Sequence, residues 1–233
     1  MESGRGKTMG IEDIDESILN LWEDFRNRNI RDRVLSCAGA LADRDFSVLP
    51  VPTISEANRS IVGRISRHMK VYYWETLYLE ELGILETLKA RGNRVKGVAQ
   101  SCGYLWSTKK TPQMPRGSVF MSTVCAVTMD GVLVKIQPEG VPIFQHGAGP
   151  ELVIVVAGVN SIVDQVEDGF RRAKDTCIPL CAKRFGVKLP CVKPEHCVEC
   201  AEPPPVCVVN TVVTRKPVKP DILVVLIGEY LGR

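Results

Sequence analysis

The sequence predicts an α/β fold built on a mostly parallel sheet. Residues 152–157 form a continuous apolar run, rich in β-branched residues, as expected of a strand covered on both faces of a parallel sheet. Strand-like and helix-like segments alternate along the 233 residues, the pattern of repeated strand–helix–strand units. No low-complexity linker divides the chain, so we expect one main domain.

A helical N-terminal segment is predicted over residues 1–45, ahead of an α/β domain over residues 46–233. Its first helix is indicated by apolar residues at helical spacing: Ile11, Ile14, Ile18, Leu21, Trp22 and Phe25. Four acidic residues in its first turn suit the positive end of the helix dipole. A second helix is predicted over residues 31–42.

The next elements alternate in type. Residues 46–51 are predicted to be a short strand, ended by Pro50 and Pro52. Ser55 can cap a helix that runs to residue 66. A strand over residues 68–74, a helix over 77–90 and a strand over 95–99 follow, on the evidence of Val-rich and then helical apolar spacing.

The second half is predicted to complete the sheet. Residues 118–129 and 132–137 form a hairpin around Asp130-Gly131, a dipeptide suited to a tight turn. Loops are expected over 101–117 and 138–150. After the strand at 152–157, Asn160 or Ser161 caps a helix, and 179–185 form another. Strands over 208–214 and 222–227 are predicted to close the same sheet.

Composition excludes several classes of protein. The net charge of +3 is mild and no basic block is interleaved with aromatic residues, so nucleic-acid binding is not implied. No apolar run approaches the ~20 residues of a membrane span. Residues 1–16 are charged and predict no signal peptide. Nine cysteines without such a peptide predict a cytoplasmic protein, in which thiols serve as ligands more often than as disulfides.

The Cys-rich loop at residues 190–207 carries the strongest functional signal. Cys191, Cys197, Cys200 and Cys207 have the spacing C-x5-C-x2-C-x6-C, with four prolines and no apolar periodicity between them. Such a segment buries too little apolar surface to order itself. Four thiolates on an iron–sulfur cluster or on zinc would order it. Two disulfides, or four incidental cysteines, are the alternatives.

Spaced motifs in the C-terminal third resemble the lactate-utilisation (LUD) domain family. They are residues 158–163 (GVNSIV), 171–172 (RR), 179–184 (PLCAKR), the four cysteines, Asn210 and residues 228–232 (GEYLG). The likeness runs from residue 118 to the end, and more weakly over 79–83. It implies a Rossmann-like sheet similar to sugar-phosphate isomerases and CoA transferases, and a link to L-lactate oxidation in multi-subunit iron–sulfur systems.

Three segments depart from the family pattern. Residues 74–76 (WET) lie where the family usually has Gly-Gly-Ser. Residues 125–128 (CAVT) lie where it usually has Asn-Ala-Ile-Thr, and residues 140–142 (GVP) lie where it usually has Gly-Asn-Arg. Glycine-rich turns and an arginine would suit an anionic ligand. These departures therefore predict an altered or lost small-molecule pocket beside a retained cysteine loop.

Five further residues are candidates for ligand binding. Gly158 and Asn160 follow the best strand, where open α/β sheets bind ligands, although a plain turn with an Asn cap explains them equally. Lys183 and Arg184 could meet an anion or a thiolate cluster, or simply face solvent. Glu229 could be a pocket acid or part of a salt bridge. Cys177 and Cys181 are expected to be buried thiols, and His196 is a substitute metal ligand.

Three functions compete, and no catalytic residue is assigned. The first is an electron-transfer accessory subunit with a [4Fe–4S] cluster, working with other redox subunits on lactate or a related 2-hydroxy acid. The second is a zinc-stabilised scaffold without catalysis. The third is a CoA-transferase-like or isomerase-like enzyme, for which Glu229 or Glu75 would be the carboxylate nucleophile. A homo-oligomer is compatible with each.

Overall fold

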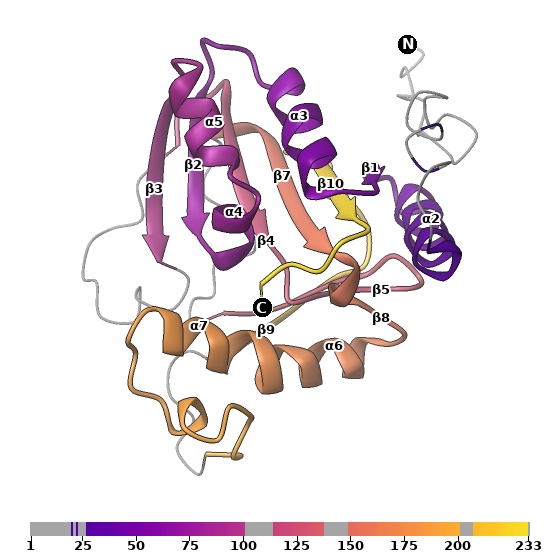
Figure 1. Ribbon diagram of the computed structural model, residues 1–233, viewed down its shortest axis with the longest axis vertical. Helices are drawn as coiled ribbons and strands as arrows, with labels where there is room; N and C mark the ends of the chain where they lie inside the picture. The colour runs from indigo at the N-terminus through magenta and orange to yellow at the C-terminus, as the bar shows by residue number, and fades with distance from the viewer. Residues whose placement is uncertain are drawn as a thin grey trace.

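The computed structural model describes residues 20, 22, 27–100, 114–137, 149–200 and 207–232. It confirms the predicted α/β fold with a parallel, Rossmann-like sheet and a helix near the N-terminus (Figure 1). The first predicted helix, over residues 11–25, lies almost wholly outside the described residues. Of that segment, Trp22 is buried and its indole N–H donates to the Pro50 carbonyl at 3.3 Å. The boundary at residue 45 stays a prediction.

The main sheet has six strands in the order β1-β10-β7-β4-β2-β3, and every described pairing within it is parallel. The strands are β1 (Ser47–Val51), β2 (Lys70–Glu75), β3 (Arg94–Gln100), β4 (Ser118–Thr123), β7 (Pro150–Gly158) and β10 (Asp221–Ile227). The predicted run at 152–157 is the core of β7, between β4 and β10. As an inner strand, β7 has both faces covered by other parts of the protein, and it is therefore apolar throughout.

Both faces of this sheet are buried, because successive side chains of a strand point to opposite sides. In β7, Val153 and Val155 belong to one apolar cluster while Ile154 and Val156 belong to the other. Helices α3 (Ile54–Arg64), α4 (Leu77–Glu81) and α5 (Ile84–Ala90) cover the second cluster (Figure 1). Helix α2 (Arg28–Ala42) covers the first, through Val34, Cys37 and Leu41 among others.

Two helix predictions need correction. The cap of α3 is Thr53, whose hydroxyl accepts from the Glu56 N–H at 3.2 Å, rather than Ser55. The predicted helix over 77–90 is two helices, because Gly83 adopts a left-handed conformation with φ of 62° between them. Glycine takes this conformation without the steric penalty that other residues meet.

A second sheet was not predicted. Its order is β8-β5-β6-β9, with β5 (Ala126–Thr128), β6 (Leu133–Gln137), β8 (Ile162–Val163) and β9 (Val209–Val213). The hairpin around Asp130-Gly131 is confirmed as β5 and β6, but the strand predicted over 118–129 breaks before Cys125 and changes sheets. The prediction that residues 208–214 close the main sheet is wrong: β9 pairs with β6, and β10 alone joins the main sheet.

One long helical segment packs under the second sheet. It consists of α6 (Val166–Arg172), a π-helical turn (Ala173–Cys177) and α7 (Ile178–Arg184). It begins after Gln165 rather than at Asn160 or Ser161, because Ile162 and Val163 pair with β5. In a regular α-helix, Pro179 would press on the Asp175 carbonyl, which accounts for the wider π turn just before it.

The second sheet and the helical segment lie below the carboxyl ends of the main strands (Figure 1). The Cys-rich loop follows α7 and begins with a short 3-10 turn (Pro190–Val192). Across the described ranges, no helix is long and apolar enough to cross a membrane.

Candidate functional site

A cavity lies at the carboxyl end of the main sheet, where the two sheets and the helical segment meet. The space between its walls is about 750 Å³, a figure that includes open solvent at its mouth. Its walls come from the segments that follow β2 and β4, from β6 and from the helical segment: Thr76, Leu77, Tyr78, Thr123, Val124, Cys125, Lys135, Ile136, Arg172, Thr176, Cys177, Ile178, Leu180, Cys181 and Gly232.

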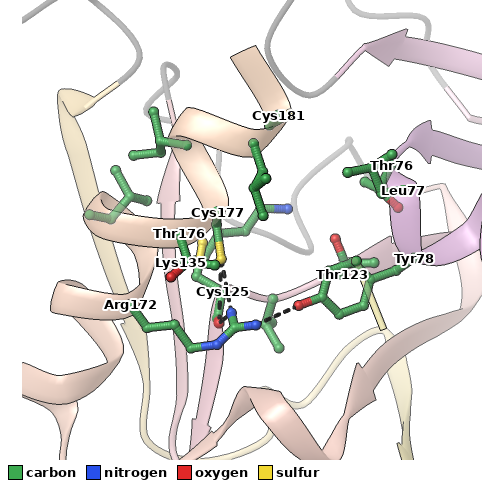
Figure 2. Close-up of a pocket in the computed structure, with 15 residues that line it drawn as sticks. Thr76, Leu77, Tyr78, Thr123, Cys125, Lys135, Arg172, Thr176, Cys177 and Cys181 are labelled. Carbon is green, nitrogen blue, oxygen red and sulfur yellow. Dashed lines mark hydrogen bonds between the residues drawn. The ribbon is translucent and has the colours of Figure 1, made fainter. Parts of the chain in front are cut away.

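The guanidinium of Arg172 joins the walls of this pocket. Its Nε donates to the Asn160 carbonyl at 2.7 Å, and its Nη2 donates to the Tyr78 hydroxyl at 2.9 Å. Its Nη1 donates to the Cys177 sulfur at 2.9 Å and to the Cys125 carbonyl (Figure 2). All three nitrogens are thus engaged with protein atoms. Arg172 therefore holds the pocket in shape and is not available as a ligand clamp.

Cys125 and Cys177 form a pair of thiols in the pocket wall. Cys125 and Cys177 pack in one cluster, and the Cys177 S–H donates to the Cys125 carbonyl at 3.8 Å. Interaction with the Cys177 thiol is the first reason why the pKa of Cys125 falls to about 7 despite burial, and the cations of Lys135 and Arg172 contribute to the same shift. Interaction with Cys125, together with burial, holds the pKa of Cys177 well above its usual value. Cys125 is therefore the thiol of the pair that ionises first.

Lys135 is the second cation of the pocket. Its side chain projects from β6, lies 4.4 Å from the centre of a Trp74 ring, and donates to the Ser122 hydroxyl at 3.3 Å. Burial lowers the pKa of Lys135 to about 8, and the Cys125 thiolate opposes that shift. Because a buried ammonium with weak partners is costly, Lys135 is suited to pairing with an anion that enters the pocket.

The four cysteines of the Cys-rich loop lie behind the pocket. Cys191 is buried in an apolar cluster with Cys125, Ile136 and Ile178, and Cys207 packs against that cluster. The Cys197 N–H donates to the Asp175 carboxylate at 3.1 Å, which ties the loop to the π turn. Residues 201–206 lie outside the described ranges. The pocket and the loop therefore share one packed wall.

The thiols of this loop are free and influence one another electrostatically. All four are outside disulfides. Burial and, to a smaller extent, the other three thiols raise the pKa of Cys207 to about 11. Burial and the thiols of Cys197 and Cys200 likewise raise the pKa of Cys191. Four groups that repel each other as thiolates form a donor set that a multivalent cation would stabilise.

Three of the predicted ligand residues hold the C-terminal segment instead of lining the pocket. The Asn160 amide donates to the Leu231 carbonyl at 2.9 Å and accepts from its N–H at 3.1 Å. A Cβ at Gly158 would stand 2.8 Å from the Glu229 carbonyl oxygen. The Glu229 carboxylate accepts from the Ile54 N–H at 2.7 Å, at the start of α3. Their ligand roles stay predictions.

The remaining candidates lie on the surface. Lys183 pairs with Glu195 of the Cys-rich loop, and Arg184 pairs with Glu80 at 2.9 Å. His196 is exposed and its Nδ1 lies 2.9 Å from the Pro194 carbonyl oxygen. None of these lines the pocket.

Sequence reasoning missed the pocket residues Lys135 and Arg172 and undervalued Cys177. The prediction that Cys177 and Cys181 are buried thiols needs correction, because both are half-buried and Cys181 is disulfide-bonded. The signal that could have found the pocket residues is the family departure itself, since Thr76 and Cys125 belong to two of the altered segments and both line the pocket. Arg172 also belongs to a motif that carried the resemblance. Their convergence depends on the second sheet, which the sequence pattern did not predict.

Comparisons with known proteins identify a family. A family model described as the LUD domain matches residues 37–227. A solved DUF162 family protein from Deinococcus radiodurans is 12% identical; the match covers 91% of this chain and 96% of that one, with a TM-score of 0.39. The solved eIF2B delta from Chaetomium thermophilum is 14% identical; that match covers 66% of this chain and 54% of the other, with a TM-score of 0.29. No curated protein matches the chain by sequence.

Proposed function

Because this chain belongs to the LUD domain family, we propose that it is an iron–sulfur-binding redox protein. It would serve as an electron-transfer accessory subunit, with partner subunits, in the metabolism of lactate or a related 2-hydroxy acid. The observation that carries the proposal is the position of the Cys-rich loop. Its thiols pack against the wall of a pocket that contains a buried cation.

The donor set fits an iron–sulfur cluster. Four free thiols, of which Cys191 and Cys207 have a pKa raised in part by the others, would supply the four cysteine ligands of such a cluster. Within the described ranges, no three His, Cys, Asp or Glu side chains are grouped closely enough to hold one metal ion.

The shared wall gives the two sites a physical connection. Cys191 and Cys207 of the loop pack in the same apolar cluster as Cys125 and Ile136 of the pocket. When bound, an iron–sulfur group supplies one-electron transfer at a potential set by its surroundings. The packed wall would keep that group beside the pocket and exclude water between them.

On the pocket side, this chain's residues suit a small anion. The Lys135 ammonium would pair with a carboxylate, since the Arg172 guanidinium is already engaged with Asn160, Tyr78 and Cys177. Leu77, Val124 and Ile136 would cover the apolar part of a short organic acid. Thr123 and Tyr78 offer hydroxyls within the same walls.

A partner surface would adjoin the loop. Val198 in the loop is 41% exposed, and Val208 and Val212 just after it are 59% and 40% exposed. Val212 belongs to β9, which is the edge strand of the second sheet. Exposed valines on a sheet edge are a liability unless another chain covers them, which supports a role as one subunit of a larger assembly.

Anaerobic purification tests the proposal. We expect about four irons and four acid-labile sulfides per chain with broad visible absorption. The Cys197→Ser/Cys200→Ser variant should lose them. The control variant Cys37→Ser, on the buried face of helix α2, should keep them. About one zinc per chain and no colour would instead support the zinc-stabilised scaffold. A folded protein with neither metal would overturn both.

A further inference from the structure

The pair formed by Cys125 and Cys177 has no role in the proposed cluster. Both thiols are free, and both line the pocket rather than the outer face of the loop. Their sulfurs lie side by side, and Arg172 donates to that of Cys177 (Figure 2). Two neighbouring thiols beside two cations, in the wall of a cavity, form a redox site in their own right.

We propose that Cys125 and Cys177 are a redox-active dithiol that reduces small disulfides entering the pocket. This inference is independent of what the Cys-rich loop binds. It rests on the packing of the two thiols against each other, on the guanidinium of Arg172 that donates to both residues, and on the cavity whose wall they form.

The reaction proceeds by two exchanges. The Cys125 thiolate attacks one sulfur of the disulfide RSSR, so that a Cys125–SR bond forms and the S–S bond of RSSR breaks, releasing one RS⁻, which takes up a proton. The Cys177 thiol then loses its proton and attacks the Cys125 sulfur, forming the Cys125–Cys177 disulfide and releasing the second RS⁻. The protein loses two electrons and RSSR becomes two RSH. An external dithiol would return the protein to its reduced state.

The environment assigns the two steps. Cys125 attacks because it lies beside the cations of Lys135 and Arg172, whose charges favour its thiolate. Cys177 stays protonated until the mixed disulfide has consumed that thiolate. The Arg172 Nη1, 2.9 Å from the Cys177 sulfur, then stabilises the resolving thiolate as it forms. A cation beside a thiolate favours the charged form.

The walls select the disulfide. Leu77, Val124, Ile136 and Leu180 present an apolar surface, which suits short aliphatic arms. Lys135 is the cation whose pairing the protein leaves weakest, with a 3.3 Å bond to Ser122 and the Trp74 ring. The preferred substrate is therefore a small aliphatic disulfide that carries a carboxylate.

The test uses two probes of similar size. Reduced full-length protein is mixed anaerobically with 3,3′-dithiodipropionate, which carries carboxylates, or with the neutral bis(2-hydroxyethyl) disulfide. We expect a Cys125–Cys177 linked peptide in a non-reducing digest, formed faster with the carboxylate probe. In Lys135→Met, the preference for the carboxylate probe should disappear.

Three single variants separate the roles. Cys177→Ser should accumulate a mixed disulfide on Cys125. In Cys125→Ser, labelling of the pair should slow by about a hundredfold or more, because the attacking thiolate is gone. The control Cys37→Ser should behave like the unmodified chain, since burial raises the pKa of Cys37 to about 12. Linkage of Cys125 to a cysteine of the Cys-rich loop, or an unreacted Cys125 in the folded, unmodified chain, would overturn the proposal.

Discussion

The pocket and the Cys-rich loop both present cysteines, but they hold them in opposite ways. Cys125 and Cys177 lie on elements fixed by the second sheet and by Arg172, which donates to Cys177, to two carbonyls and to Tyr78. The loop has one short 3-10 turn among its described residues, and Cys197 and Cys200 are half-exposed. The first pair is positioned by the fold, and the second set needs a ligand to position it.

This difference bears on function. A dithiol that exchanges disulfides needs two sulfurs in fixed contact before the substrate arrives. A cluster-binding loop can instead acquire its geometry on binding, because the binding free energy then contributes to ordering. The two regions therefore respond to different perturbations, and the following variants are chosen to separate them.

Arg172→Met should have the largest effect on stability. It removes the donor that serves the carbonyls of Cys125 and Asn160 and the Tyr78 hydroxyl, and leaves these partly buried groups unpaired. We expect a loss of about 3 kcal/mol in the free energy of unfolding, measured with urea. Arg171→Met is the control: that side chain is 70% exposed and pairs only with Asp168 among the described contacts, so its loss should stay below about 0.5 kcal/mol. Equal losses would contradict the central place of Arg172.

Lys135→Met should stabilise the protein. In the folded state the pKa of Lys135 is about 8, below its ordinary value of 10.5, because burial disfavours the ammonium. Between pH 8 and 10.5 the unfolded chain binds more protons, so this residue makes stability rise with pH in that window. At pH 7 we expect a gain of about 1–2 kcal/mol after loss of the Ser122 and Trp74 contacts.

That gain should shrink at pH 10, where the folded unmodified chain already carries a neutral Lys135. Urea denaturation of both chains at the two pH values is the measurement. A variant that is less stable at pH 7 would show that the cation has a strong partner, and would weaken its assignment as the anion-binding group of the pocket.

Glu229→Gln should cost about 1 kcal/mol, because its carboxylate accepts from the Ile54 N–H at the start of α3, where a negative charge is favoured. It should leave the rate of Cys125–Cys177 disulfide formation unchanged, since Glu229 is not part of the pocket lining. A much slower formation of the Cys125–Cys177 disulfide without a loss of stability would support Glu229 as a pocket acid.

The sequence predicted the main sheet well because its signal is local. An apolar run such as 152–157 is interpretable alone, and so is a set of cysteines within 17 residues of one another. The second sheet was missed because β8 has two residues and β5 has three, too short for any periodicity. Their pairing comes from tertiary contacts that no short window contains.

The pocket was missed for the same reason. Tyr78, Cys125, Lys135 and Arg172 come from four separate segments, and each has an ordinary local explanation in the sequence. Only the crossing of the chain from β4 into β5, and the return of the helical segment beneath it, brings them together. The possible ligands of the loop can be identified from the spacing of its cysteines, whereas the pocket residues depend on how the strands and helices are connected in space.

Cys197→Ser/Cys200→Ser should have the smallest effect, provided that it is measured on metal-free protein. Both side chains are half-exposed and outside disulfides, and the bond from the Cys197 backbone N–H to Asp175 does not involve the altered sulfur. With chelator present we expect the free energy of unfolding to change by less than about 0.5 kcal/mol. Cys125→Ser/Cys177→Ser is the matched reference; there, burial and lost hydrogen bonds should cost about 1–3 kcal/mol. If the free energy of unfolding fell as much in the loop variant as in the pocket variant, the loop would be part of the folded core. A bound metal would then not be needed to explain its order.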